Sequence, residues 1–180
     1  MPQTGTVTIY TIGHSTRTLV EFGALLGEAG IEMLVDVRAI PRSRTNPQFN
    51  SDTLPVSLAE RGVGYEHIAE LGGRRHHPRG APPSPNTFWR NESFRNYADY
   101  AATDTFKAGM SRLRELAMSR SCAIMCSETL WWRCHRRIIS DYLLADGVAV
   151  LHIMGSHKTE PAVLTPNAHK IGDGTLLYRA

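Results

Sequence analysis

The stretch VTIYTIGHSTRTLVEFGALLGEAGIEMLVDVR, residues 7–38, decides the fold that we expect for this chain. It opens with a β-branched run at 7–12, which is typical of a strand. Thr18 and Glu21 then have the spacing of a helical capping box, and apolar residues follow at helical intervals. A second short apolar run lies at 33–37. Strand, helix and strand in so short a span form the repeating unit of a parallel sheet.

The rest of the chain continues this pattern. Further strands are expected at 64–68, 122–126 and 148–153, and further helices at 56–62, in two consecutive stretches after residue 91, and at 134–145. Asp104 is expected to cap the second helix of the consecutive pair. Residues 157–180 are expected to form an irregular closing arm. We therefore predict one α/β domain over residues 1–180, with a mostly parallel sheet flanked by helices.

Length and composition narrow the class of protein. A chain of 180 residues with 42% hydrophobic residues suits a single core, and no apolar run approaches the roughly 18 residues of a membrane span. The start of the chain is short and polar, unlike a signal peptide. Three cysteines, an odd number, suit a reducing compartment better than a disulfide framework. We expect a cytoplasmic protein with no membrane partner, and the oligomeric state is left open.

The basic residues are almost all arginines. Only three of the 20 basic residues are lysines, and the formal net charge is +3. Arginine binds phosphate or carboxylate through a planar fork. A genome-wide preference for arginine codons explains the overall bias equally well, so the positions of the arginines matter more than their number.

Polar residues gather where the expected strands end. Ligands of parallel α/β sheets bind beyond the carboxyl ends of the strands, because loops and helix N-termini meet there. The residues expected on this rim are His14, Ser15, Asp36, Arg38, Arg42, Ser43, His67, Cys126, Glu128, Cys134, His135 and Arg136.

Cys126 and Cys134 have three possible roles. They could bind zinc together with His14 and His135, but their seven intervening residues exceed the usual spacing of paired cysteine ligands. Either could be a nucleophile, activated by a helix N-terminus and by His135 or Arg136. Cys126 could also be a small buried strand residue, whereas Cys134 at a helix start is harder to explain in this way. We expect no metal ion and no cofactor.

Glu128 and Asp36 are the candidate acid–base groups. Glu128 follows a buried strand and precedes two tryptophans, and apolar walls raise the pKa of a carboxyl group. The alternative for each carboxylate is an ion pair with a nearby arginine. The two roles are equally weighted for both residues.

The sequence His135-Arg136-Arg137 at a helix start is the best anion site in the chain. Arg136 is expected to clamp a phosphate. Trp131 and Trp132 either stack on a base or cover the core or a dimer contact. Further arginines flank the same rim and form either a surface for a phosphate backbone or a solvated loop; they are Arg42, Arg44, Arg74, Arg75, Arg79 and Arg90.

Several phrases resemble the prokaryotic domain-of-unknown-function family numbered 488. They are TIGHS (11–15), DVRAIPRSR (36–44), LGGRR (71–75), FRNYADYAATDTFKAGM (94–110) and MCSETLWWRCHRR (125–137). The Cys-x-Glu…Cys-His-Arg element is the most specific of them. The resemblance implies a compact α/β fold with a site that contains Asp36, Arg38, Cys126, Glu128, Cys134, His135 and Arg136. The Trp-Trp stretch at 129–132 departs from a Lys-Asp-Pro-like stretch in many members, so the substrate need not be shared.

The expected function is an enzyme, a hydrolase or transferase, that acts on a phosphate-bearing substrate such as a nucleotide or nucleic acid. Arg38 and Arg136 would bind phosphate, Glu128 or Asp36 would transfer protons, and a cysteine could be the nucleophile. No P-loop, Rossmann glycine fingerprint or GxSxG elbow is present, and CSETLWWR has one residue too many for a Cys-x5-Arg phosphatase loop. The alternatives are a non-catalytic nucleic-acid-binding module and a thiol-based or metal-based sensor.

Overall fold

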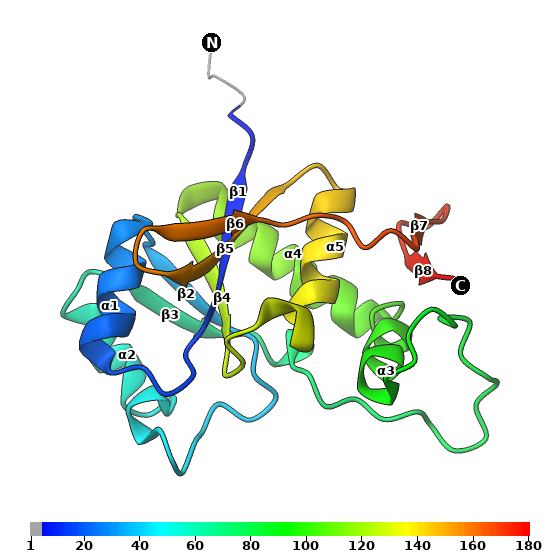
Figure 1. Ribbon diagram of the computed structural model, residues 1–180, viewed down its shortest axis with the longest axis horizontal. Coiled ribbons are helices and arrows are strands. Elements are labelled where there is room, and N and C mark those ends of the chain that lie inside the picture. Colours follow the sequence, from blue (N-terminus) through cyan, green and yellow to red (C-terminus); the bar gives the residue numbers. More distant parts are fainter. Residues whose placement is uncertain (1–4) are drawn as a thin grey trace.

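The computed structural model describes residues 5–180 and has a six-stranded sheet at its centre, in the order β3-β2-β4-β1-β5-β6 (Figure 1). The strands are β1 (Thr8–Gly13), β2 (Met33–Asp36), β3 (Gly64–His67), β4 (Cys122–Cys126), β5 (Ala149–Gly155) and β6 (Lys158–Pro161). Strands β1 to β5 are parallel, and β6 pairs antiparallel with β5. The predicted α/β fold with a mostly parallel sheet is confirmed.

Two layers of helices cover the two faces of this sheet (Figure 1). The helices are α1 (Leu19–Glu28), α2 (Leu54–Ala59), α3 (Glu92–Tyr100), α4 (Asp104–Ser119) and α5 (Arg136–Ala145). One core joins α3, α4 and α5 to Cys122, Ile124 and Cys126, and the other joins α1 and α2 to Ala123 and Met125. Successive residues of β4 point to opposite faces, so this strand contributes to both cores and is buried along its whole length.

The insertion of β4 between β1 and β2 determines which residues meet at the carboxyl end of the sheet. The register places Cys126 beside Gly13 and Met125 beside Asp36. Residues that follow three different strands are therefore brought to one edge. Gly13 also lets the chain after β4 cross close above it, because a Cβ atom there would collide with the carbonyl oxygen of Glu128.

The helix starts agree with the sequence in one case and differ in two. The capping box of Thr18 and Glu21 is present in both directions. Thr103, and not Asp104, caps α4, because its hydroxyl accepts from the backbone N–H of Phe106 while Asp104 begins the helix. Helix α5 begins at Arg136 because a short 3-10 turn, η3 (Trp131–Arg133), leads Cys134 into extended backbone.

The C-terminal residues expected to be irregular form short strands instead. Strand β6 extends the main sheet, and β7 (Ala168–Lys170) pairs with β8 (Leu176–Tyr178) in a two-stranded sheet. The alternation of buried Leu176 and Tyr178 holds this pair on the helical layer, and the Tyr178 hydroxyl donates to Asp141 of α5. Within residues 5–180, no helix is long and apolar enough to cross a membrane.

Candidate active site

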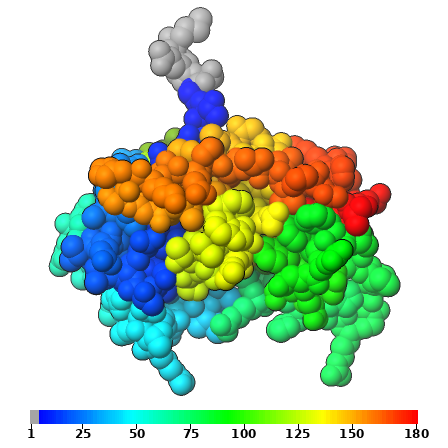
Figure 2. Space-filling view, in the orientation of Figure 1, coloured from blue at the N-terminus to red at the C-terminus, as the bar shows by residue number. Residues whose placement is uncertain are grey.

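A pocket of about 1280 Å³ opens at the carboxyl ends of β1, β2 and β4. In the space-filling view, two projecting segments, cyan and green, frame the recessed lower edge of the molecule (Figure 2). Ten residues predicted for the site line the pocket: His14, Ser15, Arg38, Arg42, Ser43, Arg74, Cys126, Glu128, Cys134 and His135. Five that were expected on the rim or at its anion site are not among its lining residues: Asp36, His67, Trp131, Trp132 and Arg136.

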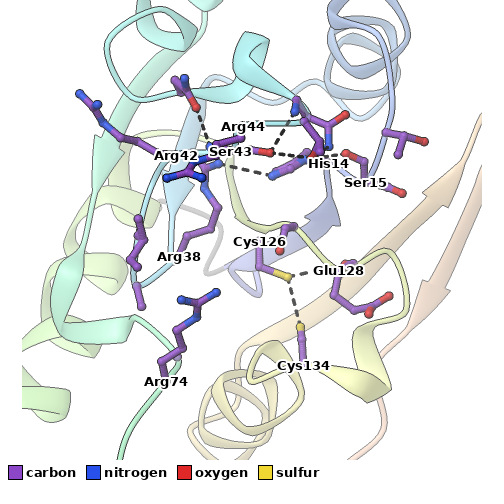
Figure 3. Close-up of a pocket in the computed structure, with 18 of the residues that line it drawn as sticks. His14, Ser15, Arg38, Arg42, Ser43, Arg44, Arg74, Cys126, Glu128 and Cys134 are labelled. Carbon is purple, nitrogen blue, oxygen red and sulfur yellow. Dashed lines mark hydrogen bonds between the residues drawn. The ribbon is translucent and has the colours of Figure 1, made fainter.

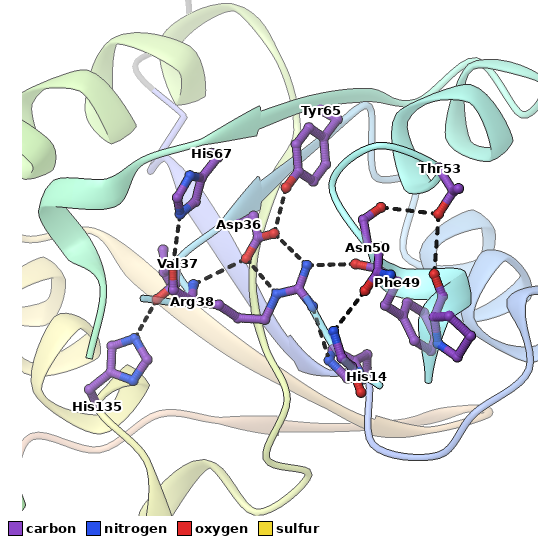
Figure 4. A network of polar contacts seen from close by, with 12 residues as sticks. His14, Asp36, Val37, Arg38, Phe49, Asn50, Thr53, Tyr65, His67 and His135 are labelled. Carbon is purple, nitrogen blue, oxygen red and sulfur yellow. Dashed lines mark hydrogen bonds and ion pairs between the residues drawn. The ribbon is translucent and has the colours of Figure 1, made fainter. Parts of the chain in front are cut away.

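Asp36 is fully buried and bound to Arg38 (Figure 4). Its carboxylate accepts from Nε of Arg38 at 2.9 Å and from Nη2 at 2.7 Å, and the hydroxyl of Tyr65 donates to the same group. Burial alone would lower the pKa of Arg38, but the hydrogen bonds and charge of Asp36 outweigh it and raise that pKa. Of the two roles considered for Asp36, the geometry is that of the ion pair.

His14 lies between Arg38 and the loop after β1. Its Nε2 atom is 3.4 Å from Nη1 of Arg38, which can only donate, so Nε2 is the acceptor and Nδ1 carries the hydrogen that it donates to the Ser15 carbonyl at 2.8 Å. The ring stacks on Phe49 with centroids 4.4 Å apart. Burial lowers the pKa of His14, which keeps the ring neutral in this arrangement.

The sulfur atoms of Cys126 and Cys134 are 3.2 Å apart (Figure 3). Nε of Arg136 is 3.0 Å from the Cys126 sulfur and 3.2 Å from the Cys134 sulfur, and the backbone N–H of Arg136 points at Cys134 from 3.4 Å. Cys134 therefore sits at the N-terminal end of α5, where positive charge favours a thiolate.

The two cysteines differ in their pKa, so one holds a proton more strongly than the other. Burial raises the pKa of Cys126, and the neighbouring charge of Cys134 raises it further. For Cys134 burial acts in the same direction, but the hydrogen bond from Cys126 and the charge of Arg136 outweigh it and bring its pKa well below the usual value. The favoured state is a Cys134 thiolate that accepts a hydrogen bond from the Cys126 thiol.

Arg136 is buried and its donors are occupied, so the expected phosphate clamp is not what the structure contains. Besides the two sulfurs, its guanidinium donates to Oγ1 of Thr11 at 3.0 Å and to the backbone carbonyls of Glu128 and Thr129. The sequence placed Arg136 at the correct helix end. Only the packing shows that its side chain turns inward and stabilises the thiolate.

Trp131 is half-buried beside the site, and Trp132 is exposed. Trp131 stacks on His152 with centroids 4.4 Å apart, and its indole N–H donates to Glu160. Trp132 packs edge-to-face on Trp131 and is 41% exposed. Of the two roles left open for them, the geometry of Trp131 is that of a covering residue, because its ring face is already occupied.

His135 and Gly73 form one wall of the pocket. The ring donates from Nε2 to the Val37 carbonyl at 2.7 Å, which leaves Nδ1 as the basic nitrogen (Figure 4). Burial lowers the pKa of His135 and so favours the neutral ring. Nδ1 lies close to Gly73, where a Cβ atom would be 3.0 Å away. Sequence reasoning did not select Gly73, and the Gly-Gly pair at 72–73 was the available signal.

Glu128 has one fixed oxygen. Oε1 accepts from the backbone N–H of Leu130 at 3.0 Å, which orients the carboxylate at the edge of the pocket. Among the described residues, Glu128 is the only acidic side chain that lines the pocket, whereas four arginines line it: Arg38, Arg42, Arg44 and Arg74. The lining side chains of the pocket therefore carry more positive than negative formal charge.

The arginines at the outer part of the pocket are exposed. Arg42 is 67% exposed and its ion pair with Asp52 is long, at 3.8 Å. Arg44 and Arg74 are exposed as well, and Arg74 has a positive φ of 56°. Three other arginines of the expected surface, Arg75, Arg79 and Arg90, do not line the pocket, and Arg75 stacks on Tyr100. In the described part of the chain, residues 5–180, no group of three or more His, Cys, Asp or Glu is arranged to hold a metal ion.

Comparison with known proteins gives one result. The family model of the domain of unknown function DUF488 matches residues 18–143. That range includes both cysteines and most of the pocket. No curated protein and no solved structure matches the chain.

Proposed function

This chain belongs to the family of the domain of unknown function DUF488, and for its activity we propose an enzyme, a hydrolase or transferase, that acts on a phosphate-bearing substrate such as a nucleotide or nucleic acid. The observation that carries the proposal is the position of Cys134 in a pocket lined by four arginines, with Nε of Arg136 3.2 Å from its sulfur. A nucleophile and a set of anion-binding groups in one cavity are what such a reaction requires.

The exposed arginines would bind the phosphate groups. Arg42, Arg44 and Arg74 surround the opening, and their guanidinium groups suit bidentate contacts with phosphate oxygens. The pocket volume of about 1280 Å³ lies above the range usual for small-molecule sites, roughly 300–1,000 Å³. That size favours a nucleotide or a segment of nucleic acid over a simple phosphate ester.

Cys134 would attack the substrate, because its thiolate is the strongest nucleophile in the pocket. Glu128 and His135 are the groups that could move a proton to or from the leaving group, since both line the cavity. Asp36 would act differently from the acid–base role first considered for it. Its oxygens are engaged by Arg38 and Tyr65, so we assign it to the positioning of Arg38.

The test combines turnover with trapping. The wild-type protein is incubated with bis(p-nitrophenyl) phosphate, with nucleoside mono- and triphosphates and with a single-stranded oligonucleotide, and products and intact protein mass are followed. We expect turnover of at least one of these probes, and its loss in Cys134→Ser. Cys122→Ser is the matched control, because Cys122 is a buried cysteine of β4 that does not line the pocket. Equal turnover by Cys134→Ser would overturn the proposal.

Binding distinguishes an enzyme pocket from a broad nucleic-acid-binding face. For a labelled oligonucleotide at low salt, we expect Arg74→Ala and Arg42→Ala each to weaken binding about tenfold, from the loss of one charged hydrogen-bonding group. Arg90→Ala should leave the affinity unchanged, since Arg90 is exposed but lies outside the pocket. A loss with Arg90→Ala as large as with Arg74→Ala would favour the non-catalytic binding module.

A further inference from the structure

The two sulfur atoms at the base of the pocket differ in their access to solutes. Both cysteines line the cavity, but Cys134 is partly exposed, whereas Cys126 at the end of β4 is only 3% exposed. Figure 3 shows the two sulfurs facing one another across a short gap. The gap is 3.2 Å, and a disulfide bond is about 2.05 Å long, so closure needs the sulfurs to approach by only about 1.2 Å.

We propose that Cys134 and Cys126 form a peroxide-responsive dithiol, in which a hydroperoxide oxidises Cys134 and Cys126 then closes a disulfide with it. Each sulfur lies where its step in the reaction requires. The attacking sulfur faces the pocket through which a small hydroperoxide can enter, and the resolving thiol is already in contact with it. The proposal is carried by two sulfurs in contact, of which the Cys134 sulfur is the more exposed to the cavity.

The chemistry proceeds in two balanced steps. The Cys134 thiolate attacks one peroxide oxygen, the O–O bond breaks, and Cys134 becomes a sulfenic acid while hydroxide, or an alkoxide from an organic hydroperoxide, leaves. The Cys126 thiol then attacks the sulfenic sulfur, the S–O bond breaks, and a disulfide and water form. The two cysteines together lose two electrons, which the hydroperoxide accepts.

Arg136 makes this oxidation easy to reverse. Its guanidinium is buried against both sulfurs, so the thiolate of the reduced pair is its neutralising partner. The disulfide has no charge and leaves that guanidinium with only neutral acceptors, Thr11 and the Glu128 and Thr129 carbonyls. A positive charge that stabilises the reduced form makes a disulfide more oxidising, so small thiols should reduce this one readily.

Oxidation would also remove the nucleophile from the pocket. This consequence rests on the proposed function, in which the Cys134 thiolate attacks the phosphate-bearing substrate. A hydroperoxide would then switch the enzyme off, and a thiol reductant would restore it. The disulfide itself does not depend on the proposed function.

The test counts free thiols. Reduced wild-type protein is exposed to hydrogen peroxide, quenched, denatured and alkylated, and its mass and peptides are analysed. The chain has three cysteines, so the reduced protein should take three labels and the oxidised protein only one, on Cys122. Peptides joined through Cys126 and Cys134 should appear, and dithiothreitol should restore all three labels. Persistence of three labels, a bond to Cys122, or sulfinic acid without a disulfide would overturn the proposal.

Variants separate the two steps. Cys126→Ser should accumulate a Cys134 sulfenic acid that dimedone traps, and Cys134→Ser should resist the same peroxide dose. Cys122→Ser should form the disulfide as the wild type does, because its sulfur contacts the Arg120 carbonyl at the far end of β4. If a variant fails to fold, the peptide map of the oxidised wild-type protein still shows whether Cys126 and Cys134 are joined. If the disulfide forms but the protein turns over none of the phosphate probes, only the proposed function is contradicted. If the protein turns over a probe but forms no disulfide, only this inference is contradicted.

Discussion

Replacement of Asp36 by asparagine tests the buried ion pair that holds Arg38 at the pocket. Asp36 and Arg38 are 0% and 5% exposed, and their charged atoms are 2.7 Å apart. At an effective dielectric constant of about 20, that separation corresponds to about 6 kcal/mol of attraction. Asp36→Asn removes it and turns an amide donor or a weaker acceptor toward a guanidinium that remains charged and buried.

The expected cost is about 3–5 kcal/mol of unfolding free energy, the range found when one partner of a buried ion pair is removed. With a urea m-value of about 2 kcal/mol/M, the unfolding midpoint should fall by roughly 1.5–2.5 M. The exposed pair of Arg42 and Asp52, 3.8 Å apart, supplies the control. Asp52→Asn should cost less than about 1 kcal/mol.

Urea unfolding followed by circular dichroism and tryptophan fluorescence measures both variants. An Asp36→Asn midpoint within about 0.5 M of the wild-type value would show that the carboxylate is not engaged as the structure has it. A stable Asp36→Asn protein with full turnover would instead show that Asp36 is not needed to position Arg38.

Three further predictions follow from single contacts. Arg136→Gln should raise the pKa of Cys134, because the guanidinium beside its sulfur lowers that pKa, and the midpoint of the alkylation rate against pH should move upward while Cys122 is unaffected. Burial lowers the pKa of His152 to about 4, so the unfolded chain binds a proton at this residue before the folded chain does as the pH falls below 6.5. The protein should therefore lose up to about 3 kcal/mol of unfolding free energy between pH 6.5 and pH 4. His152→Gln should flatten this part of the curve of unfolding free energy against pH. Gly73→Ala should lower the free energy of unfolding in urea by about 1 kcal/mol, because its Cβ atom would press on the His135 ring. Gly27→Ala on α1 is the control and should be neutral or stabilising, since no atom lies within 4 Å of a Cβ atom there. Equal effects of the two substitutions would contradict the close approach of Gly73 to His135.

The fold was largely predictable because its signals are local. The β-branched run of β1, the capping box at Thr18 and the continuous apolar run of β4 each depend on residues close in the chain. Boundaries were less well predicted where two local choices compete. Thr103 and Asp104 can both cap a helix, and the hydroxyl that reaches Phe106 is the one used. The short strands β7 and β8 have too few residues for their alternation to stand out.

The location of the pocket that forms the candidate site was predictable for a second physical reason, namely that parallel strands share one carboxyl edge. That rule alone brought His14, Arg38, Cys126 and the start of α5 together. It could not indicate the directions of the side chains. Arg136 was expected to face a ligand and instead faces the two sulfurs.

The sequence by itself determined the strand and helix order and the set of residues near one edge, since periodicity and strand direction are properties of the chain. Only the tertiary structure decided which charge pairs with which. Asp36 pairs with Arg38, and the thiolate of Cys134 pairs with Arg136. Such pairing depends on distances of a few ångströms between segments that the fold brings together, and on burial, which makes an unpaired charge costly.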